Sequence, residues 1–217
     1  PSVHRLQRDS ATHSAESVMS GRQELNAGGR SVAFKRHPNY LDIVEKPSNP
    51  DFAWAVRRYT SNECYAEVNY ALRTDDRVLL KKYEDLINYL RCFLRPCQER
   101  CTVYRGVRLQ AYQHEVYQVN ETFLWPGFTS TSRSESTATC FGSWGDGGVS
   151  VLFTIELHRG IGVTYSRDIS SLSSYPQEEE VLLDCYSGFR VTSRSWCGAR
   201  LDIGLVPIDT VQVENDY

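Results

Sequence analysis

Four polar side chains interrupt apolar segments of this 217-residue chain, and they are its first candidates for chemistry. Arg105 stands in "CTVYRGVRL" and Ser130 in "WPGFTSTS", while Glu178 and Glu180 stand in "SSYPQEEEVLLDC". A guanidinium binds phosphate or carboxylate through paired hydrogen bonds, and a carboxylate stabilises positive charge that develops during a reaction. These residue types therefore suit a ligand that carries anionic groups and passes through a cationic state.

Arg105 is expected to share a strand face with Val103 and Val107, because side chains alternate between the two faces of a strand. On an apolar face the guanidinium needs an anion, since an unpaired buried charge is costly. A structural salt bridge and a grip on a ligand's phosphate or carboxylate are both open interpretations. Gly106, the next residue, would let a ligand approach the backbone closely.

The acidic triplet runs directly into an apolar segment, "VLL". If residues 178–182 are extended, Glu178 and Glu180 lie on one face with Cα atoms about 6.6 Å apart, and Glu179 points to the other side. Two carboxylates on one wall suit chemistry at a sugar carbon that becomes positively charged. One stabilises the cation, while the other holds or deprotonates the incoming group. The alternative is a solvated acidic turn before a strand.

The serine-rich stretch is expected to be extended, with Phe128, Ser130 and Ser132 on one face. The run from Ser132 to Glu135 has the pattern of a capping box, so we assign Ser132 to the start of a short helix that ends near Gly142. Ser130 is then the inward hydroxyl that is available to orient a neighbouring group.

The elements that hold these residues are predicted to be helices first and strands afterwards. Asn49, Pro50 and Asp51 predict a helix start with Asn49 as the cap. A second helix follows residues 60–61, and a third is predicted over 79–94. Period-two patterns then indicate strands, most clearly over 103–109 and 149–157. Helices followed by strands indicate an α+β fold rather than an alternating parallel sheet.

Residues 1–48 contain few periodic apolar positions. We therefore interpret 1–48 as an N-terminal extension, partly disordered, regulatory or draped over the main domain, and 49–217 as that main domain.

Composition excludes several classes of function. With 41% hydrophobic residues, 24% charged residues and a net charge of −3, the chain shows no excess of basic residues of the kind that binds nucleic acid. It also lacks an apolar run long enough to span a membrane. The content of seven cysteines slightly favours a secreted or extracellular location. Cys92, Cys97 and Cys101 lack a fourth ligand nearby, so we expect no metal.

Taken together and in this order, the three stretches resemble the Arg–Ser–Glu triad of mono-ADP-ribosyltransferases. The likeness is to the branch that includes vertebrate ecto-enzymes and actin-modifying bacterial toxins. A further match is "AVRRYTSNECYAEVNYALR", residues 55–73, which resembles the family's helical segment with its Tyr-Thr pair and its Asn-x-x-Leu-Arg. The resemblance covers residues 50–191.

The resemblance implies a fold and an activity. The expected fold is N-terminal helices followed by two packed, mostly antiparallel β-sheets around an NAD cleft. The expected reaction is NAD-dependent mono-ADP-ribosylation of an exposed arginine on a protein acceptor, with release of nicotinamide. NAD is then a co-substrate, and no metal is required.

The resemblance also implies roles for individual residues. Arg105 matches the arginine that binds the pyrophosphate side of NAD, with Gly106 beside it. Ser130 matches the serine that supports the catalytic glutamate, which is Glu180. Glu178 matches the acid associated with transfer to arginine.

Two aromatic positions complete the implied site. Tyr175 falls in the loop that meets the target protein, and Phe141 is placed to stack on nicotinamide with help from Trp144. Two alternatives stay open at this stage: an NAD glycohydrolase that uses water as acceptor, and a non-catalytic NAD-binding or interaction module. A Rossmann domain is excluded, because residues 145–148 do not form its glycine pattern and precede a strand.

Overall fold

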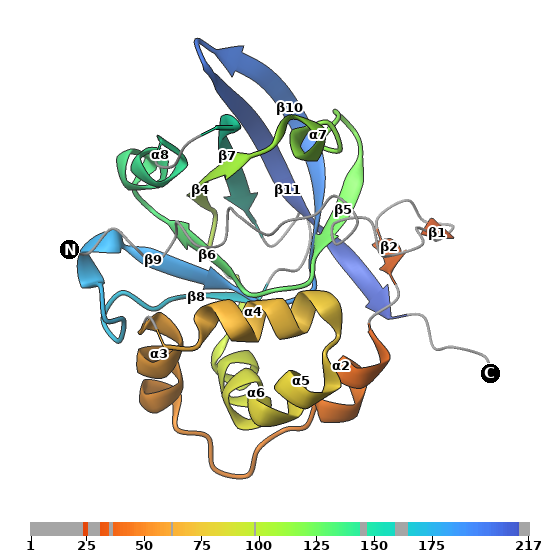
Figure 1. The fold of residues 1–217 in the computed structure, drawn as a ribbon, viewed down its shortest axis with the longest axis vertical. Helices are drawn as coiled ribbons and strands as arrows, with labels where there is room; N and C mark the ends of the chain where they lie inside the picture. Colours follow the sequence, from red (N-terminus) through yellow and green to blue (C-terminus); the bar gives the residue numbers. More distant parts are fainter. Residues whose placement is uncertain are drawn as a thin grey trace.

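The chain folds into a layer of helices packed against a strongly twisted array of strands, as the computed structural model in Figure 1 shows. The predicted α+β class is confirmed, because most of the helices precede the long strands. The residues that the structure describes are 24–25, 31–34, 37–61, 63–97, 99–143, 147–158 and 165–212.

The helical layer forms because each of its helices has one apolar face. Tyr65, Val68 and Leu72 lie three and four residues apart, which is helical spacing, on one face of the second predicted helix, and all three are buried. No helix in the described ranges is long and apolar enough to cross a membrane. The helices of this layer are α2 (Pro38–Ile43), α3 (Phe52–Thr60), α4 (Tyr65–Thr74), α5 (Arg77–Lys82) and α6 (Glu84–Phe93).

Two helix boundaries differ from the predictions. The cap of α3 is Asp51 and not Asn49, because the Asp51 carboxylate accepts the Trp54 N–H at 2.9 Å. The third predicted helix is two helices, since Tyr83 leaves helical geometry at φ −109° and ψ 14° and so separates α5 from α6.

Within the predicted extension, residues 31–34 pair with β11 (Arg200–Gln212) of the sheet, and α2 packs onto the helical layer. Tyr40 and Ile43 of α2 are buried in the same core cluster as the other helices. The Asp75 carboxylate, at the end of α4, accepts the backbone N–H groups of Asn39 and Tyr40 at 3.0 and 2.9 Å and so caps α2. A division of the chain at residue 48 and a regulatory role for residues 1–48 stay predictions.

The described strands form one hydrogen-bonded sheet with a main path in the order β1-β2-β11-β7-β4-β6-β9-β8-β3. Strands β10 and β5 lie off this path: β10 pairs with β11 and with β5. Pairing is mostly antiparallel, as predicted, but β11 runs parallel to β2 and to β7. The strands are β1 (Glu24–Leu25), β2 (Ser31–Phe34), β3 (Arg95–Pro96), β4 (Cys101–Leu109), β5 (Thr122–Trp125), β6 (Thr129–Ser132), β7 (Val149–Leu157), β8 (Tyr165–Asp168), β9 (Glu180–Leu183), β10 (Ser187–Cys197) and β11 (Arg200–Gln212).

The path consists of two stretches that meet at a single registered pair, Tyr104 of β4 with Ser132 of β6. One apolar cluster lies against the helical layer and includes Leu182, and a second lies among the strands and includes Val181 and Leu183. Strand β9 therefore contributes alternate side chains to two cores. Two further helices, α7 (Ala111–His114) and α8 (Glu135–Ser143), lie on the strand side of the molecule (Figure 1).

Candidate active site

Arg105 lies in the middle of β4, between buried Val103 and Val107 as the sequence predicts. Its side chain is 5% exposed, and its guanidinium donates a hydrogen bond of 2.8 Å to the backbone carbonyl of Ser130. Burial removes the guanidinium from water, so its remaining donors favour anionic or carbonyl partners. The structure thus brings the arginine of β4 to the serine strand, β6.

Strand β6 also pairs with β9, the strand that begins at Glu180, and the register between the two strands is unambiguous. Ser130 pairs with Leu182, and Ser132 pairs with Glu180. Because directly opposed residues of antiparallel strands point to the same face, both serines share a face with Glu180. The residue opposite Glu180 is Ser132, however, and a direct role for the Ser130 hydroxyl in holding Glu180 stays a prediction.

The acidic triplet is not a continuous strand, which corrects the sequence interpretation. Glu178 ends a 3₁₀ turn, η2 (Pro176–Glu178), Glu179 has left-handed backbone geometry with φ 48°, and β9 begins only at Glu180. The outcome for burial is nevertheless the one expected: Glu178 and Glu180 are 4% and 1% exposed, while Glu179 is exposed. The left-handed residue turns the chain between the two acids, so Glu178 and Glu180 are both buried although the triplet is not an extended strand.

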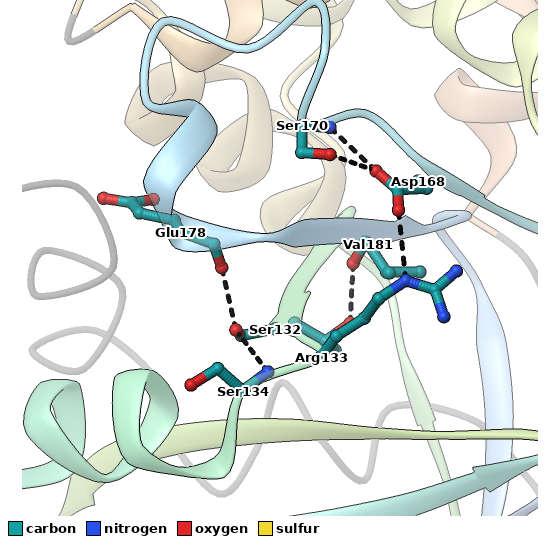
Figure 2. Close-up of polar contacts among 8 residues, drawn as sticks. Ser132, Arg133, Ser134, Asp168, Ser170, Glu178 and Val181 are labelled. Carbon is teal, nitrogen blue, oxygen red and sulfur yellow. Dashed lines mark hydrogen bonds and ion pairs between the residues drawn. The ribbon is translucent and has the colours of Figure 1, made fainter.

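Ser132 has a different role from the one assigned to it. Its hydroxyl donates to the backbone carbonyl of Glu178 at 2.7 Å and accepts the Ser134 N–H at 3.0 Å (Figure 2). The helix cap is Ser134, whose hydroxyl accepts the Thr137 N–H at 3.2 Å. Ser132 therefore ties the serine strand to the turn that presents Glu178.

The loop from β8 to β9 is held at its two ends by Arg133. The Arg133 N–H donates to the Glu179 carbonyl at 3.1 Å, and its guanidinium contacts the Asp168 carboxylate at 3.0 Å (Figure 2). Burial raises the pKa of Asp168, but hydrogen bonds from Ser170 and Arg133 outweigh burial and lower the pKa below its ordinary value. The carboxylate is thus kept ionised for both partners.

Sequence reasoning missed Ser132 and Arg133 as positioning residues because it used Ser132 for the cap. The signal in the sequence was that the Ser132 hydroxyl lies on the same strand face as Ser130, where it is able to orient a neighbouring group. Nothing local marks Arg133 or Asp168, since they meet across 35 residues of sequence.

Helix packing is sufficient to explain the glycine at position 106, and the approach of a ligand to Gly106 stays a prediction. A Cβ atom there would lie 1.7 Å from the backbone oxygen of Ala138 and 2.9 Å from the backbone nitrogen of Gly142, both in α8. The same helix carries Phe141, which is 5% exposed. Contact between nicotinamide and Phe141 stays a prediction, and Trp144 lies outside the described residues.

Tyr175 immediately precedes η2 and is half-buried. Its carbonyl accepts the Glu178 N–H at 3.1 Å, and its own N–H donates to the Ser173 hydroxyl at 3.1 Å. The predicted target-recognition residue is therefore coupled through the backbone to Glu178.

A cavity of about 640 Å³ lies elsewhere, at the far end of β9. Its lining includes Asn88, Arg91 and Asp184 and none of the predicted site residues. The candidate site is nevertheless placed at Arg105, Ser130 and the two glutamates, because their charged side chains are buried whereas Arg91 and Asp184 of the cavity are half-buried. Within the described ranges no cluster of three or more histidine, cysteine or acidic side chains could hold a metal, and all seven cysteines are free thiols.

Comparison with known proteins decides the family. The model of the family described as NAD:arginine ADP-ribosyltransferase matches residues 39–211, which is most of the chain. The chain belongs to this family. The Arg–Ser–Glu resemblance of the sequence is thereby confirmed.

Two relatives from distant organisms show the same affiliation. Mav of Mycobacterium avium (strain 104), named as an NAD(+)--arginine ADP-ribosyltransferase, is 32% identical over 151 residues, which are 69% of this chain and 17% of Mav. An erythroblast NAD(P)(+)--arginine ADP-ribosyltransferase of Gallus gallus is 30% identical over 111 residues, covering 51% of this chain and 31% of that protein. The chain thus spans less than a third of the length of either relative.

Solved structures confirm that the fold is that of an ADP-ribosyltransferase. Vis, an ADP-ribosyltransferase toxin from Vibrio splendidus, was solved in complex with agmatine and matches with a TM-score of 0.60 at 24% identity, covering 78% of this chain and 83% of Vis. The eucaryotic mono-ADP-ribosyltransferase ART2.2 matches with a TM-score of 0.53 at 21% identity, covering 82% of this chain and 75% of that one. The ADP-ribosyltransferase fold thus accounts for the arrangement of helices and strands described above.

Proposed function

We propose that this ADP-ribosyltransferase chain transfers the ADP-ribosyl group of NAD to an arginine side chain of a protein and releases nicotinamide. The observation that carries the proposal is that β6 contacts all three charged residues, whose side chains are buried: its Ser130 carbonyl accepts the Arg105 guanidinium, its Ser132 hydroxyl donates to the Glu178 backbone carbonyl, and Ser132 pairs with Glu180 along the strand. Family membership and the arginine-specific names of both relatives support it.

The charged side chains of the site fit the charges of NAD. NAD supplies an anionic pyrophosphate and a ribose carbon that becomes cationic as neutral nicotinamide leaves. Arg105 would bind the pyrophosphate, because a guanidinium fork pairs with phosphate oxygens. Glu180 would hold the ribose side and stabilise the positive charge, which a carboxylate removed from water does strongly.

Glu178 serves the acceptor. The pKa of arginine lies far above neutral pH, so its side chain is protonated, and a protonated guanidinium is a poor nucleophile. Glu178 would orient the guanidinium of the acceptor and take its proton late, as the new bond to the ribose carbon completes. Its place on a separate turn keeps this task distinct from that of Glu180. The complex of Vis with agmatine, a small guanidinium compound, supports an arginine-like acceptor.

The decisive experiment measures nicotinamide release from NAD and transfer to agmatine by the whole chain and by single variants. In Glu180→Gln, both reactions should fall by about 100-fold or more, as expected when a transition-state charge loses its partner. In Glu178→Gln, transfer should fall by about tenfold or more while release without acceptor stays within about threefold of wild type.

Glu179→Gln is the matched control, because it removes the exposed acid of the same triplet. It should retain both reactions. Release of nicotinamide with no modified agmatine would instead identify an NAD glycohydrolase or a different acceptor. No release by the wild type would point to a non-catalytic NAD-binding module. The preference for an extracellular compartment stays a prediction.

A further inference from the structure

The last two residues of α3 connect the helical layer to both halves of the site. Tyr59 is 1% exposed, and its ring packs edge-on against Phe128, which precedes the serine strand, at a centroid distance of 5.6 Å. Thr60 is fully buried and faces the loop that carries Tyr175. One helix end therefore contacts the serine strand and the loop before the glutamates.

The contact of Thr60 with this loop is a directed hydrogen bond. The Ser174 N–H donates to the Thr60 hydroxyl at 3.0 Å, and the two hydroxyl oxygens lie 3.3 Å apart. The Thr60 hydroxyl is within donating distance, 3.3 Å, of both the Arg57 carbonyl and the Ser174 hydroxyl. Whichever of the two accepts its single proton, the oxygen keeps a lone pair for the Ser174 N–H.

This bond acts at the middle of the loop, whereas the bonds made by Ser132 and Arg133 act near its ends. From Ser174 the connection to the acid is short. Ser174 is bonded to Tyr175, whose carbonyl accepts the Glu178 N–H at 3.1 Å. Glu180, by contrast, is held by its pairing with β6.

We propose that Thr60 is a positioning residue for the acceptor arginine, holding Ser174 so that Tyr175 and Glu178 stay in register with the separately anchored Glu180. The proposal rests on the proposed function and adds to it. Loss of the Thr60 hydroxyl should leave the cleavage of NAD nearly intact and impair the transfer step, because the middle of this loop connects to Glu178, whereas Glu180 is held by its pairing with β6.

The test compares Thr60→Val with Thr60→Ser. Valine keeps the volume and removes the hydroxyl, and serine keeps the hydroxyl. We expect kcat/KM for transfer to agmatine to fall by about tenfold in Thr60→Val, since small misplacements of catalytic groups have effects of this size or larger. Nicotinamide release without acceptor should stay within about twofold of wild type in both variants, and Thr60→Ser should restore transfer.

Two matched variants separate this effect from a general loss of hydroxyl groups. Thr74→Val removes the hydroxyl of the last residue of α4, which bonds its own helix at Tyr70 and not the loop, and it should behave as wild type. Ser174→Ala keeps the backbone N–H that binds Thr60, and it should retain most of the transfer activity. Equal losses of transfer and release in Thr60→Val would overturn the proposal, as would unchanged transfer.

Hydrogen exchange separates failure of this inference from failure of the proposed function. Amides of residues 169–179 should exchange faster in Thr60→Val than in wild type or Thr60→Ser, whether or not NAD is cleaved. A wild type that releases no nicotinamide would refute the proposed activity. Unchanged exchange in Thr60→Val would refute the anchoring role of Thr60 independently of activity.

Discussion

Replacement of Gly106 by alanine tests how closely α8 packs on the strand that carries Arg105. The new Cβ atom would lie 1.7 Å from the Ala138 carbonyl oxygen and 2.7 Å from the Ala138 carbonyl carbon. Both atoms belong to backbone, so no side-chain rotation relieves the overlap. Moving the oxygen to 3.0 Å, the lower limit for real Cβ contacts, requires the helix or the strand to shift by about 1.3 Å.

The magnitude follows from the cost of overpacking. Forced backbone shifts in a packed interior cost about 3 kcal/mol at the upper end of the usual range. For a domain of this size each kcal/mol lowers the melting temperature by about 2–4 °C, so Gly106→Ala should melt about 6–12 °C below wild type. Thermal unfolding followed by circular dichroism measures this shift.

Gly142→Ala is the matched control on the facing helix. Its Cβ atom would meet the Ser150 hydroxyl at 3.2 Å, and that side chain is able to rotate. Alanine is also a better helix former than glycine by about 1 kcal/mol, so this variant should melt within about 3 °C of wild type. If Gly106→Ala has the same melting temperature as wild type, α8 does not approach β4 as described and the reasoning is refuted.

Two further predictions concern the loop that presents Glu178. Ser132→Ala leaves the Glu178 carbonyl and the Ser134 N–H without their hydrogen bonds to the Ser132 hydroxyl, so it should destabilise the fold by about 1–3 kcal/mol and reduce agmatine transfer more than NAD cleavage. Equal losses in the two reactions would contradict this prediction. Ser134→Ala is the control, because it removes the cap of α8 and leaves the Ser132 hydroxyl in place. Asp168 has a lowered pKa in the folded protein, so its carboxylate contributes stability above the ordinary value of 3.8, and this contribution is lost as the pH falls through the lower folded value. Denaturant unfolding of Asp168→Asn should therefore show a smaller free energy of unfolding than wild type at about pH 7, and this difference should narrow as the pH falls below 3.8. A difference independent of pH would contradict the assignment.

Local pattern predicted most of the elements and which residues of the candidate site are buried. The alternation around Arg105 predicted a buried guanidinium on β4, and the structure confirms it at 5% exposure. The acidic triplet before "VLL" predicted two inward carboxylates and one exposed acid, which is also found, although the backbone between them is a turn. That difference arises because Pro176 and a left-handed Glu179 set the local geometry, and neither is visible in the alternation of polar and apolar residues.

The sequence by itself determined the residue types of the site, their order along the chain and the α+β class, because these depend on side-chain chemistry and on periods of two and 3.6 residues. Only the tertiary structure decided which groups hold them. Ser132 reaches Glu178 across 46 residues, Thr60 reaches Ser174 across 114, and α8 presses on Gly106. Such contacts depend on the register between strands and on the packing of helices, which bring together segments that carry no local signal of one another.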